Sequence, residues 1–213
     1  MRLWPKEKQL QVVRELENEH HVPQPPRRGG ESAVLIPLLE SEDGYDVLLE
    51  QRSLALDVQP GDICLPGGGL EGDEKPSQAA VRETVEELLV DRQQVKLLGA
   101  LDGVYGPGDR IIWPFVGMLR DYRDTWSKDE VDHTFRIPLS YFLETDPERY
   151  RAVQTTVPEE GFPYELVSGG RKYAFRKREH IFLFYRHPKA TVWGATAAII
   201  YSFCNYLKWA GAH

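Results

Sequence analysis

Residues 68–90 contain residue types whose order suggests chemistry on phosphate groups. Gly68 is followed by Glu74 and then by the run Arg82-Glu83-Thr84-Val85-Glu86-Glu87. If this run is helical, at about 100° per residue, its glutamates crowd one face, and each pair of carboxylates about 6 Å apart costs about 3 kcal/mol at an effective dielectric near 20. A hard divalent cation with oxygen ligands relieves this repulsion. The pattern therefore predicts a metal-dependent phosphoanhydride hydrolase.

The glutamates need a helix to hold them, and the sequence predicts one from Ser77 to Leu88. Its apolar stripe contains Val81 and Val85, which places the glutamates on the opposite face. Pro76 suits an early helical position because its missing N–H would be unpaired there in any case. Glycines at 67–69 let the backbone approach one side of this helix closely.

These residues resemble the Nudix box of the Nudix hydrolase superfamily, whose members cleave a nucleoside diphosphate linked to another moiety. The resemblance implies an α/β protein, a Nudix-type α/β/α sandwich with a mixed central sheet, and Mg²⁺ or Mn²⁺ as cofactor. Two positions depart from the pattern. The glycine near the end of the box is Leu89 here, and the first hydrophobic position after Arg-Glu is Thr84. Neither is a predicted metal ligand, but the loop after the helix is expected to differ at Leu89.

The residues before the box narrow the resemblance. Residues 48–53, Leu-Leu-Glu-Gln-Arg-Ser, and residues 60–68, Pro-Gly-Asp-Ile-Cys-Leu-Pro-Gly-Gly, resemble a signature of the coenzyme A pyrophosphatase branch. Other stretches similar to this branch are Ala33–Leu38, Ile137–Ser140 with Phe142 and Leu143, and Val192–Ala197. The likeness covers most of residues 33–207. It implies cleavage of coenzyme A or a derivative to 3′,5′-ADP and (acyl-)phosphopantetheine.

Other substrates and another class of function stay open because the chain departs from the branch. Asp57, Val58 and Gln59 stand where the branch has an arginine and often a further basic residue or histidine, and Leu65 replaces a phenylalanine. Missing positive charge weakens the case for an anion with several phosphates. ADP-ribose or NADH are alternative substrates, and a Nudix-fold sensor that binds a nucleotide without cleaving it is the alternative function.

The box also suggests a role for each of its charged residues. Glu83 and Glu87, one turn apart, are the first choice for direct metal ligands, and Glu86 is a further ligand or holds a metal-bound water. The family suggests that the backbone carbonyl of Gly68 completes the metal shell. Arg82 is predicted to pair with one of the carboxylates and to fix its rotamer. The competing interpretation of each glutamate is a solvated surface charge.

The general base of this superfamily often comes from a loop outside the box. Glu130 stands where the resemblance places a carboxylate that reaches the metals, and Asp129 and Glu74 are alternatives. A solvated loop charge explains Glu130 equally well. His133 is close in sequence and titrates near neutrality, but a packed or surface histidine is the simpler interpretation.

Substrate contacts are predicted in two separate stretches of the chain. Arg52, before the glycine loop, is the best candidate for a phosphate contact, and Gly67 and Gly68 let the backbone approach the substrate. Lys172 and Arg176, interleaved with aromatic residues, are candidates for gripping a 3′-phosphate. The solvent face of a strand is the competing interpretation of these two cations.

Composition agrees with a compact enzyme. The chain has 213 residues with 41% hydrophobic and 11% aromatic content, enough for one full core. A net charge of −7 argues against a general nucleic-acid partner. No run reaches the roughly 18 apolar residues of a membrane span, and residues 1–11 lack the apolar core of a signal peptide. We expect a cytoplasmic enzyme with a small nucleotide substrate, no membrane partner, a possible homodimer, and reduced thiols at Cys64 and Cys204.

The expected organisation is an N-terminal helix and Pro/Gly-rich linker over residues 1–30, then a single Nudix hydrolase domain over 31–213. Residues 3–19 are expected to form the first helix, and residues 195–209 the last. A tight hairpin is expected where residues 164–168 and 171–175 flank Gly169-Gly170. A short helical turn is predicted at 140–144, and strands at 33–39, 45–51, 61–65, 96–104 and 111–119.

Overall fold

The computed structural model describes residues 30–106 and 110–211 of the chain. The predicted N-terminal helix at residues 3–19 and the linker before Gly30 lie outside the described residues. The strands are β1 (Glu31–Ser41), β2 (Gly44–Arg52), β3 (Ile63–Cys64), β4 (Gly67–Gly69), β5 (Val95–Ala100), β6 (Val104–Tyr105), β7 (Ile111–Leu119), β8 (Val131–Pro138), β9 (Glu148–Gln154), β10 (Arg178–His187) and β11 (Ala190–Trp193). The α-helices are α2 (Pro76–Leu88), α3 (Leu139–Glu144) and α4 (Gly194–Ala210), and the short 3₁₀ helices are η2 (Arg92–Gln94), η4 (Tyr164–Leu166) and η5 (Gly170–Lys172).

The central sheet is mixed, as the resemblance implied. Its strand order is β3-β2-β1-β7-β5, with β4 paired to β1, β6 to β7 and β8 to β2. β1 and β7 run parallel, with Leu35 opposite Phe115, whereas β2 runs antiparallel to β1, with Leu38 opposite Val47. The parallel pair β1–β7 lies in the middle of this order, with β2 beside β1 and β5 beside β7.

Both faces of the sheet are buried, which explains why β1 and β2 are almost continuously apolar. In β1, Leu35 packs in the cluster under α2, and Ile36 and Leu38 point to the opposite face. In β2, Leu48 packs toward α2, and Leu49 packs on the opposite side. Each strand therefore contributes to two cores by simple alternation.

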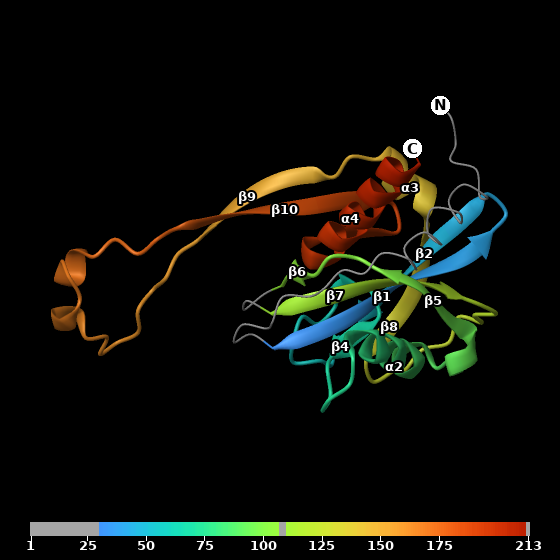
Figure 1. Ribbon diagram of the computed structural model, residues 1–213, viewed down its shortest axis with the longest axis horizontal. Helices are drawn as coiled ribbons and strands as arrows, with labels where there is room; N and C mark the ends of the chain where they lie inside the picture. The colour runs from blue at the N-terminus through green and yellow to red at the C-terminus, as the bar shows by residue number, and fades with distance from the viewer. Residues whose placement is uncertain (1–29, 107–109, 212–213) are drawn as a thin grey trace.

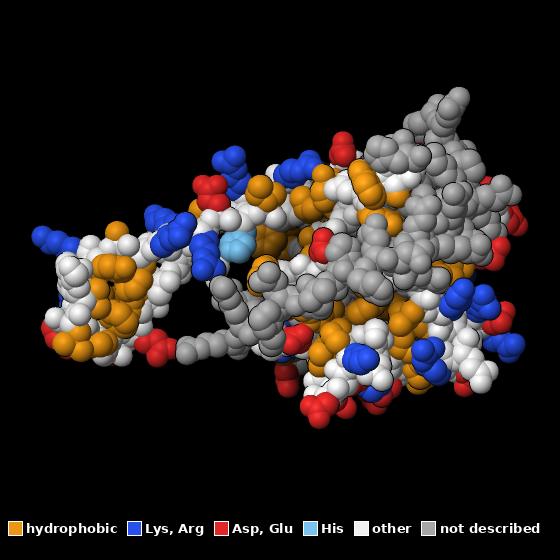
Figure 2. Space-filling model, viewed as in Figure 1, with side chains coloured by type: hydrophobic (Ala, Val, Ile, Leu, Met, Phe, Trp, Pro, Cys, Tyr) orange, Lys and Arg blue, Asp and Glu red, His pale blue; other side chains and the backbone are white. Residues whose placement is uncertain are grey.

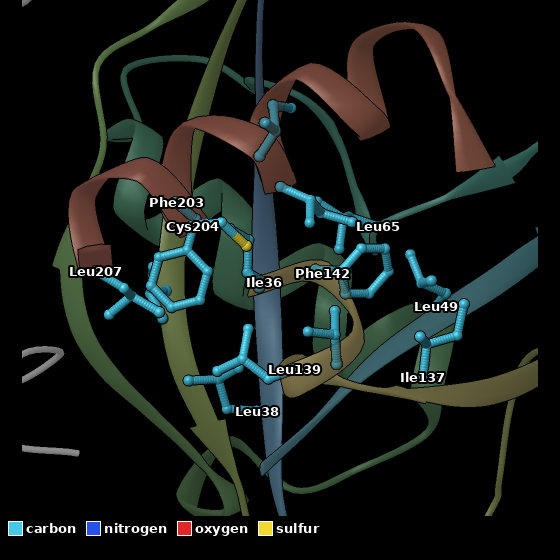
Figure 3. Packing of buried hydrophobic residues seen from close by; sticks show 14 of the residues in the cluster. Ile36, Leu38, Leu49, Leu65, Ile137, Leu139, Phe142, Phe203, Cys204 and Leu207 are labelled. Atoms are coloured by element: carbon cyan, nitrogen blue, oxygen red, sulfur yellow. The ribbon is translucent and has the colours of Figure 1, made fainter. Parts of the chain in front are cut away.

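Helices cover the two faces of the sheet. Figure 1 shows α2 on one side of the central sheet and α3 and α4 on the other. In Figure 3, Phe203, Cys204 and Leu207 of α4 lie against Ile36 and Leu38 of β1. The predicted fold class, an α/β/α sandwich with a mixed sheet, is therefore confirmed.

A second sheet, β11-β10-β9, packs at one end in the core with α4, through Tyr185 and Val192, and its strands β9 and β10 lead out of the body as an arm (Figure 1). β9 and β10 pair antiparallel from Arg178 opposite Gln154 to Phe184 opposite Glu148. The segment between them forms a tip that carries η4 and η5, far from α2 (Figure 1).

The predicted tight hairpin around Gly169-Gly170 is wrong. The two glycines have φ angles of 90° and 54°, so they do supply the positive φ expected of them. They connect η4 to η5, however, and the paired strands are β9 and β10, which lie farther out along the chain. The sequence does not reveal this pairing because it closes across residues 155–177, and no short turn fixes its register.

The other expected elements differ mainly at their ends. The run at 96–104 is two strands, β5 and β6, separated by residues 101–103. The box helix, the turn at 140–144 and the last helix are present as α2, α3 and α4, each starting one residue earlier than expected. Strands β4, β8, β9, β10 and β11 were not predicted.

Candidate active site

Helix α2 presents the box glutamates in unequal environments. Its interior face buries Ala80, Val81 and Thr84 against the sheet. Glu86 is exposed, but Glu87 is only 3% exposed. The expectation that all three glutamates face away from the buried side of the helix is therefore wrong for Glu87. The side of the helix that carries Glu87 faces the glycine strand β4, and this strand covers the Glu87 carboxylate.

The Glu87 carboxylate is held by the glycine loop. The backbone N–H of Gly67 donates to Glu87 Oε2 at 2.7 Å. Burial raises the pKa of Glu87 well above its usual value, and the nearby carboxylate of Glu50 raises it further, whereas the bond from Gly67 lowers it. A buried carboxylate with its proton affinity raised in this way favours a positive partner.

Three carboxylates converge beside the edge of α2 that carries Glu83 and Glu87. Each of Glu83, Glu87 and Glu130 offers an oxygen, and these oxygens lie within 4.8 Å of one another. Burial also raises the pKa of Glu83, with Arg82 acting in the opposite direction. Oxygen donors of this kind suit a hard divalent cation, so the residues present fit Mg²⁺ or Mn²⁺.

Glu130 reaches the cluster from a turn that is tied to α2 and β2. The Ser127 N–H donates to the backbone carbonyl of Glu87 at 2.7 Å, and the Glu130 N–H donates to the Ser127 carbonyl at 3.2 Å. The Ser53 N–H donates to the Glu130 carbonyl at 2.8 Å. These backbone bonds place the side chain of an exposed loop residue beside the box acids.

Arg82 binds several of the surrounding acids. Its guanidinium pairs with Glu74 at 2.8 Å, with Glu83 at 2.9 Å and with Glu86 at 3.0 Å, and it donates to the Gly69 carbonyl at 3.1 Å. The bond to Glu74 is the largest cause of a raised pKa for Arg82. This geometry fits the predicted role of a planar fork that fixes a carboxylate rotamer.

Glu86 lies apart from the three-carboxylate cluster. Its side chain is exposed and is held by Arg82, one turn back on the same helix. Its proposed part in metal binding or catalysis stays a prediction. Glu74, an alternative general base, is likewise engaged by Arg82 and also accepts a bond from the Glu71 N–H at 2.7 Å.

Two glycines make close approaches where the loop meets the helix, Gly67 to backbone and Gly68 to a side chain. A Cβ at Gly67 would collide with the backbone of Ala33 and Val34, and one at Gly68 would collide with the Glu83 carboxylate. The absence of a side chain at Gly68 therefore leaves its backbone next to a predicted metal ligand. That its carbonyl joins the metal shell, and that both glycines contact substrate, stay predictions.

The predicted substrate cations lie in different places. Arg52 ends β2 beside the Glu130 turn, and its Nε donates to the Val58 carbonyl at 3.3 Å. Lys172 ends η5 and Arg176 follows it, so both lie in the tip of the arm (Figure 1). The structure does not bring these two cations together with the carboxylates of the same chain.

One further acid was not singled out as a site residue from the sequence. Glu50 of β2 is 1% exposed, and burial raises its pKa to about 7, with Glu130 and Glu83 adding to the increase and the Cys64 bond and Arg52 opposing it. The only sequence signal is a charged residue that directly follows the apolar run of β2. Such a position is typical of a strand end, and only the tertiary structure shows that it is covered.

Comparison with known proteins assigns the sequence to a family. Residues 30–176 match the NUDIX domain family, which covers more than half of the chain. The chain belongs to the Nudix family. As a member with the box acids assembled, it is a Nudix pyrophosphohydrolase.

Relatives of this Nudix protein include two that are named as coenzyme A diphosphatases. It is 29% identical over 181 residues to Nudix hydrolase 3 of Caenorhabditis elegans, covering 83% of this chain and 72% of that protein. It is 30% identical over 177 residues to the mitochondrial coenzyme A diphosphatase NUDT8 of Homo sapiens, covering 81% and 67%. It is 32% identical over 126 residues to the peroxisomal coenzyme A diphosphatase NUDT7 of Mus musculus, covering 58% and 52%. Within the described part of the Nudix chain, no helix is long and apolar enough to cross a membrane.

Proposed function

We propose that this Nudix protein uses Mg²⁺ or Mn²⁺ to cleave coenzyme A or an acyl derivative to 3′,5′-ADP and (acyl-)phosphopantetheine. The proposed metal dependence rests on carboxylate oxygens of Glu83, Glu87 and Glu130 that lie within 4.8 Å of one another. The choice of substrate rests on the two relatives named as coenzyme A diphosphatases and on the stretches before the box that resemble the coenzyme A pyrophosphatase branch. We also propose that residues 31–213 act as one domain.

In this proposal the box acids hold the cation. Glu83 and Glu87 supply carboxylate oxygens, the Gly68 carbonyl completes the shell, and Glu86 is a further candidate ligand. When bound, a divalent cation neutralises charge on the phosphates and acidifies water. Arg82 keeps Glu83 in position, because it already ties that carboxylate to Glu74.

The other residues act on water and substrate. Glu130 accepts a proton from the water that attacks one phosphorus, and its exposed loop position leaves it open to solvent. The bond from that phosphorus to the bridging oxygen breaks, and the leaving phosphate keeps the electron pair. Arg52 contacts the phosphates from the end of β2, next to the Glu130 turn.

Product analysis tests this proposal. The purified protein is incubated with coenzyme A, ADP-ribose and NADH, each with Mg²⁺ or Mn²⁺, beside Glu87→Gln and the matched surface control Glu42→Gln. Cleavage of coenzyme A that is lost in Glu87→Gln and kept in Glu42→Gln supports the proposal. Cleavage of ADP-ribose or NADH alone contradicts the substrate but not the reaction class. No turnover with any substrate favours a nucleotide sensor.

We also infer that the arm binds a second copy of the chain. In the part of the chain that the structure describes, no strand pairs with the outer edge of β9, which is exposed along its whole length. Such an edge is a template for pairing with another strand. Figure 2 shows apolar side chains gathered at the tip, where Phe162, Tyr164, Tyr173 and Phe175 contact one another.

Charge also favours a second copy as the partner of this arm. Residues 169–178 contain five Lys or Arg and no Asp or Glu, whereas the whole chain has a net charge of −7. Light scattering on a sizing column tests the inference. A dimer that becomes a monomer when residues 157–175 are replaced by a short glycine-serine link supports it, and a monomeric full-length protein contradicts it. The cytoplasmic location stays a prediction, since named relatives are mitochondrial and peroxisomal.

A further inference from the structure

Glu50 is a buried acid with an unfilled hydrogen-bonding position. It lies in β2 and is 1% exposed. The Cys64 thiol donates to its Oε1 at 3.3 Å, but Oε2 is shielded from solvent and has no partner among the described residues. Leaving a carboxylate oxygen buried and unpaired is costly, so a charged or hydrogen-donating group is expected to fill this position.

The position of Glu50 in the sheet places it on the side of the cation cluster. Side chains alternate along β2, and Leu48, two residues before Glu50, packs in the core under α2. Glu50 therefore points to the α2 face of the sheet, as the box acids do. Its carboxylate interacts electrostatically with Glu87, Glu83 and Glu130, all three members of the cluster.

The charges around this oxygen are mostly negative. The nearby acids are the three cluster members, and the cation that acts on Glu50 is Arg52 of the same strand. Arg52 is itself engaged with the Val58 carbonyl. Cys64 is a thiol whose pKa burial raises well above its usual value, so it donates a hydrogen bond and brings no positive charge. Arg82 pairs with the Glu83 carboxylate, but among the described residues no Lys or Arg forms an ion pair with Glu50, Glu87 or Glu130.

We propose that Glu50 is a fourth carboxylate of the cation centre, which binds one of the waters of the ion through Oε2. Glu50 is not among the carboxylates whose oxygens lie within 4.8 Å of one another, so we assign it to a water of the ion and not to the ion itself. Magnesium keeps several waters and binds few carboxylates directly, which leaves such donors available. Glu50 is thus a positioning residue, and the inference rests on the cation-binding part of the proposed function.

Manganese binding tests this assignment without any substrate. Free Mn²⁺ is measured by electron paramagnetic resonance during titration of the wild type, Glu50→Gln and Glu87→Gln. We expect Glu50→Gln to bind Mn²⁺ about 10-fold more weakly or worse, as removal of outer-shell partners does. At a pH above about 7, the pKa to which burial raises Glu50, we also expect it to unfold at a higher temperature in chelator, because an unpaired buried charge is removed.

A matched control is available elsewhere in the core. Tyr185 Oη is the other buried side-chain atom without a partner among the described residues, and it lies in the core on the opposite face of the sheet. Tyr185→Phe removes it and should leave Mn²⁺ affinity unchanged. If Glu50→Gln does not fold, Glu50→Met, which has a similar volume and no oxygen, replaces it.

The outcomes separate the inference from the function on which it rests. Mn²⁺ affinity of Glu50→Gln within twofold of the wild type, while Glu87→Gln is impaired, overturns the role of Glu50 and leaves the cation centre intact. Unchanged affinity in Glu87→Gln overturns the cation centre itself. Equal weakening in Tyr185→Phe would show that the loss comes from general disturbance of the core, and would also overturn the assignment.

Discussion

The end of α2 provides a stability prediction that can be calculated from one backbone angle. Leu89 stands where the Nudix pattern has a glycine, and its φ of 51° and ψ of 50° are left-handed. The Val90 N–H donates to the Val85 carbonyl at 3.3 Å, as in a Schellman turn, and the Leu89 N–H donates to the same carbonyl, as in the simpler left-handed cap. Both valines pack in the core under α2. The turn expected to differ is therefore kept, with a leucine in a conformation that glycine prefers.

The magnitude follows from comparing Leu89→Gly with Leu89→Ala. The leucine side chain is 60% exposed, and both variants lose the same buried part of it. The left-handed conformation costs an L-residue about 1–2 kcal/mol, and only glycine removes this cost. Glycine also loses more backbone entropy on folding, which cancels about 0.5–1 kcal/mol of that gain. We expect Leu89→Gly to be more stable than Leu89→Ala by about 1 kcal/mol, or about 2–4 °C in Tm for a chain of this size.

Urea and thermal unfolding in chelator measure this difference without a contribution from bound metal. The same turn ties the Thr125 hydroxyl to the Leu88 carbonyl at 2.6 Å, close to the loop that carries Glu130. Glycine keeps that geometry, so turnover should stay at the wild-type level. Equal stability of the two variants, or a more stable alanine variant, would refute the assignment of backbone strain to Leu89.

Three further predictions concern the site. Gly68→Ala places a Cβ against the Glu83 carboxylate, so Mn²⁺ affinity should fall about 10- to 100-fold in a titration, with little change in far-ultraviolet circular dichroism. Arg82→Lys loses the fork that joins Glu74, Glu83 and Glu86, and kcat should fall about 10-fold or more, whereas equal kcat would contradict its positioning role. In chelator, unfolding free energy should fall as pH rises from about 4.5 toward 7 and above. The folded state holds protons on Glu50, whose pKa is raised from 4.5 to about 7, and on Glu87, and the unfolded state has already released them. Stability that rises with pH over this range would contradict that sign.

The sequence alone determined the chemistry of the site because its main residues lie close together in the chain. The spacing of Glu83 and Glu87 places both on one helix edge, and Arg82 is adjacent in the same turn. The glycines before the helix were also predicted from the sequence, because close approach of backbone needs residues without a Cβ. Five strands were also predicted near their observed positions, namely β1, β2, β3, β5 and β7. The short glycine strand β4 was not.

Tertiary structure decided what depends on contacts between distant segments. Glu130 joins the box acids because Ser53 and Ser127 bond its turn to β2 and α2, and no local pattern encodes those bonds. Glu50 and Glu87 are buried because distant segments cover them, with Cys64 bonded to Glu50 and Gly67 bonded to Glu87, whereas sequence periodicity placed Glu87 on an open face. Lys172 and Arg176 lie at the tip of an arm because β9 pairs with β10 across a long connection. Local spacing fixes which side chains share a helix face, but burial and long-range pairing arise only when the whole sheet is assembled.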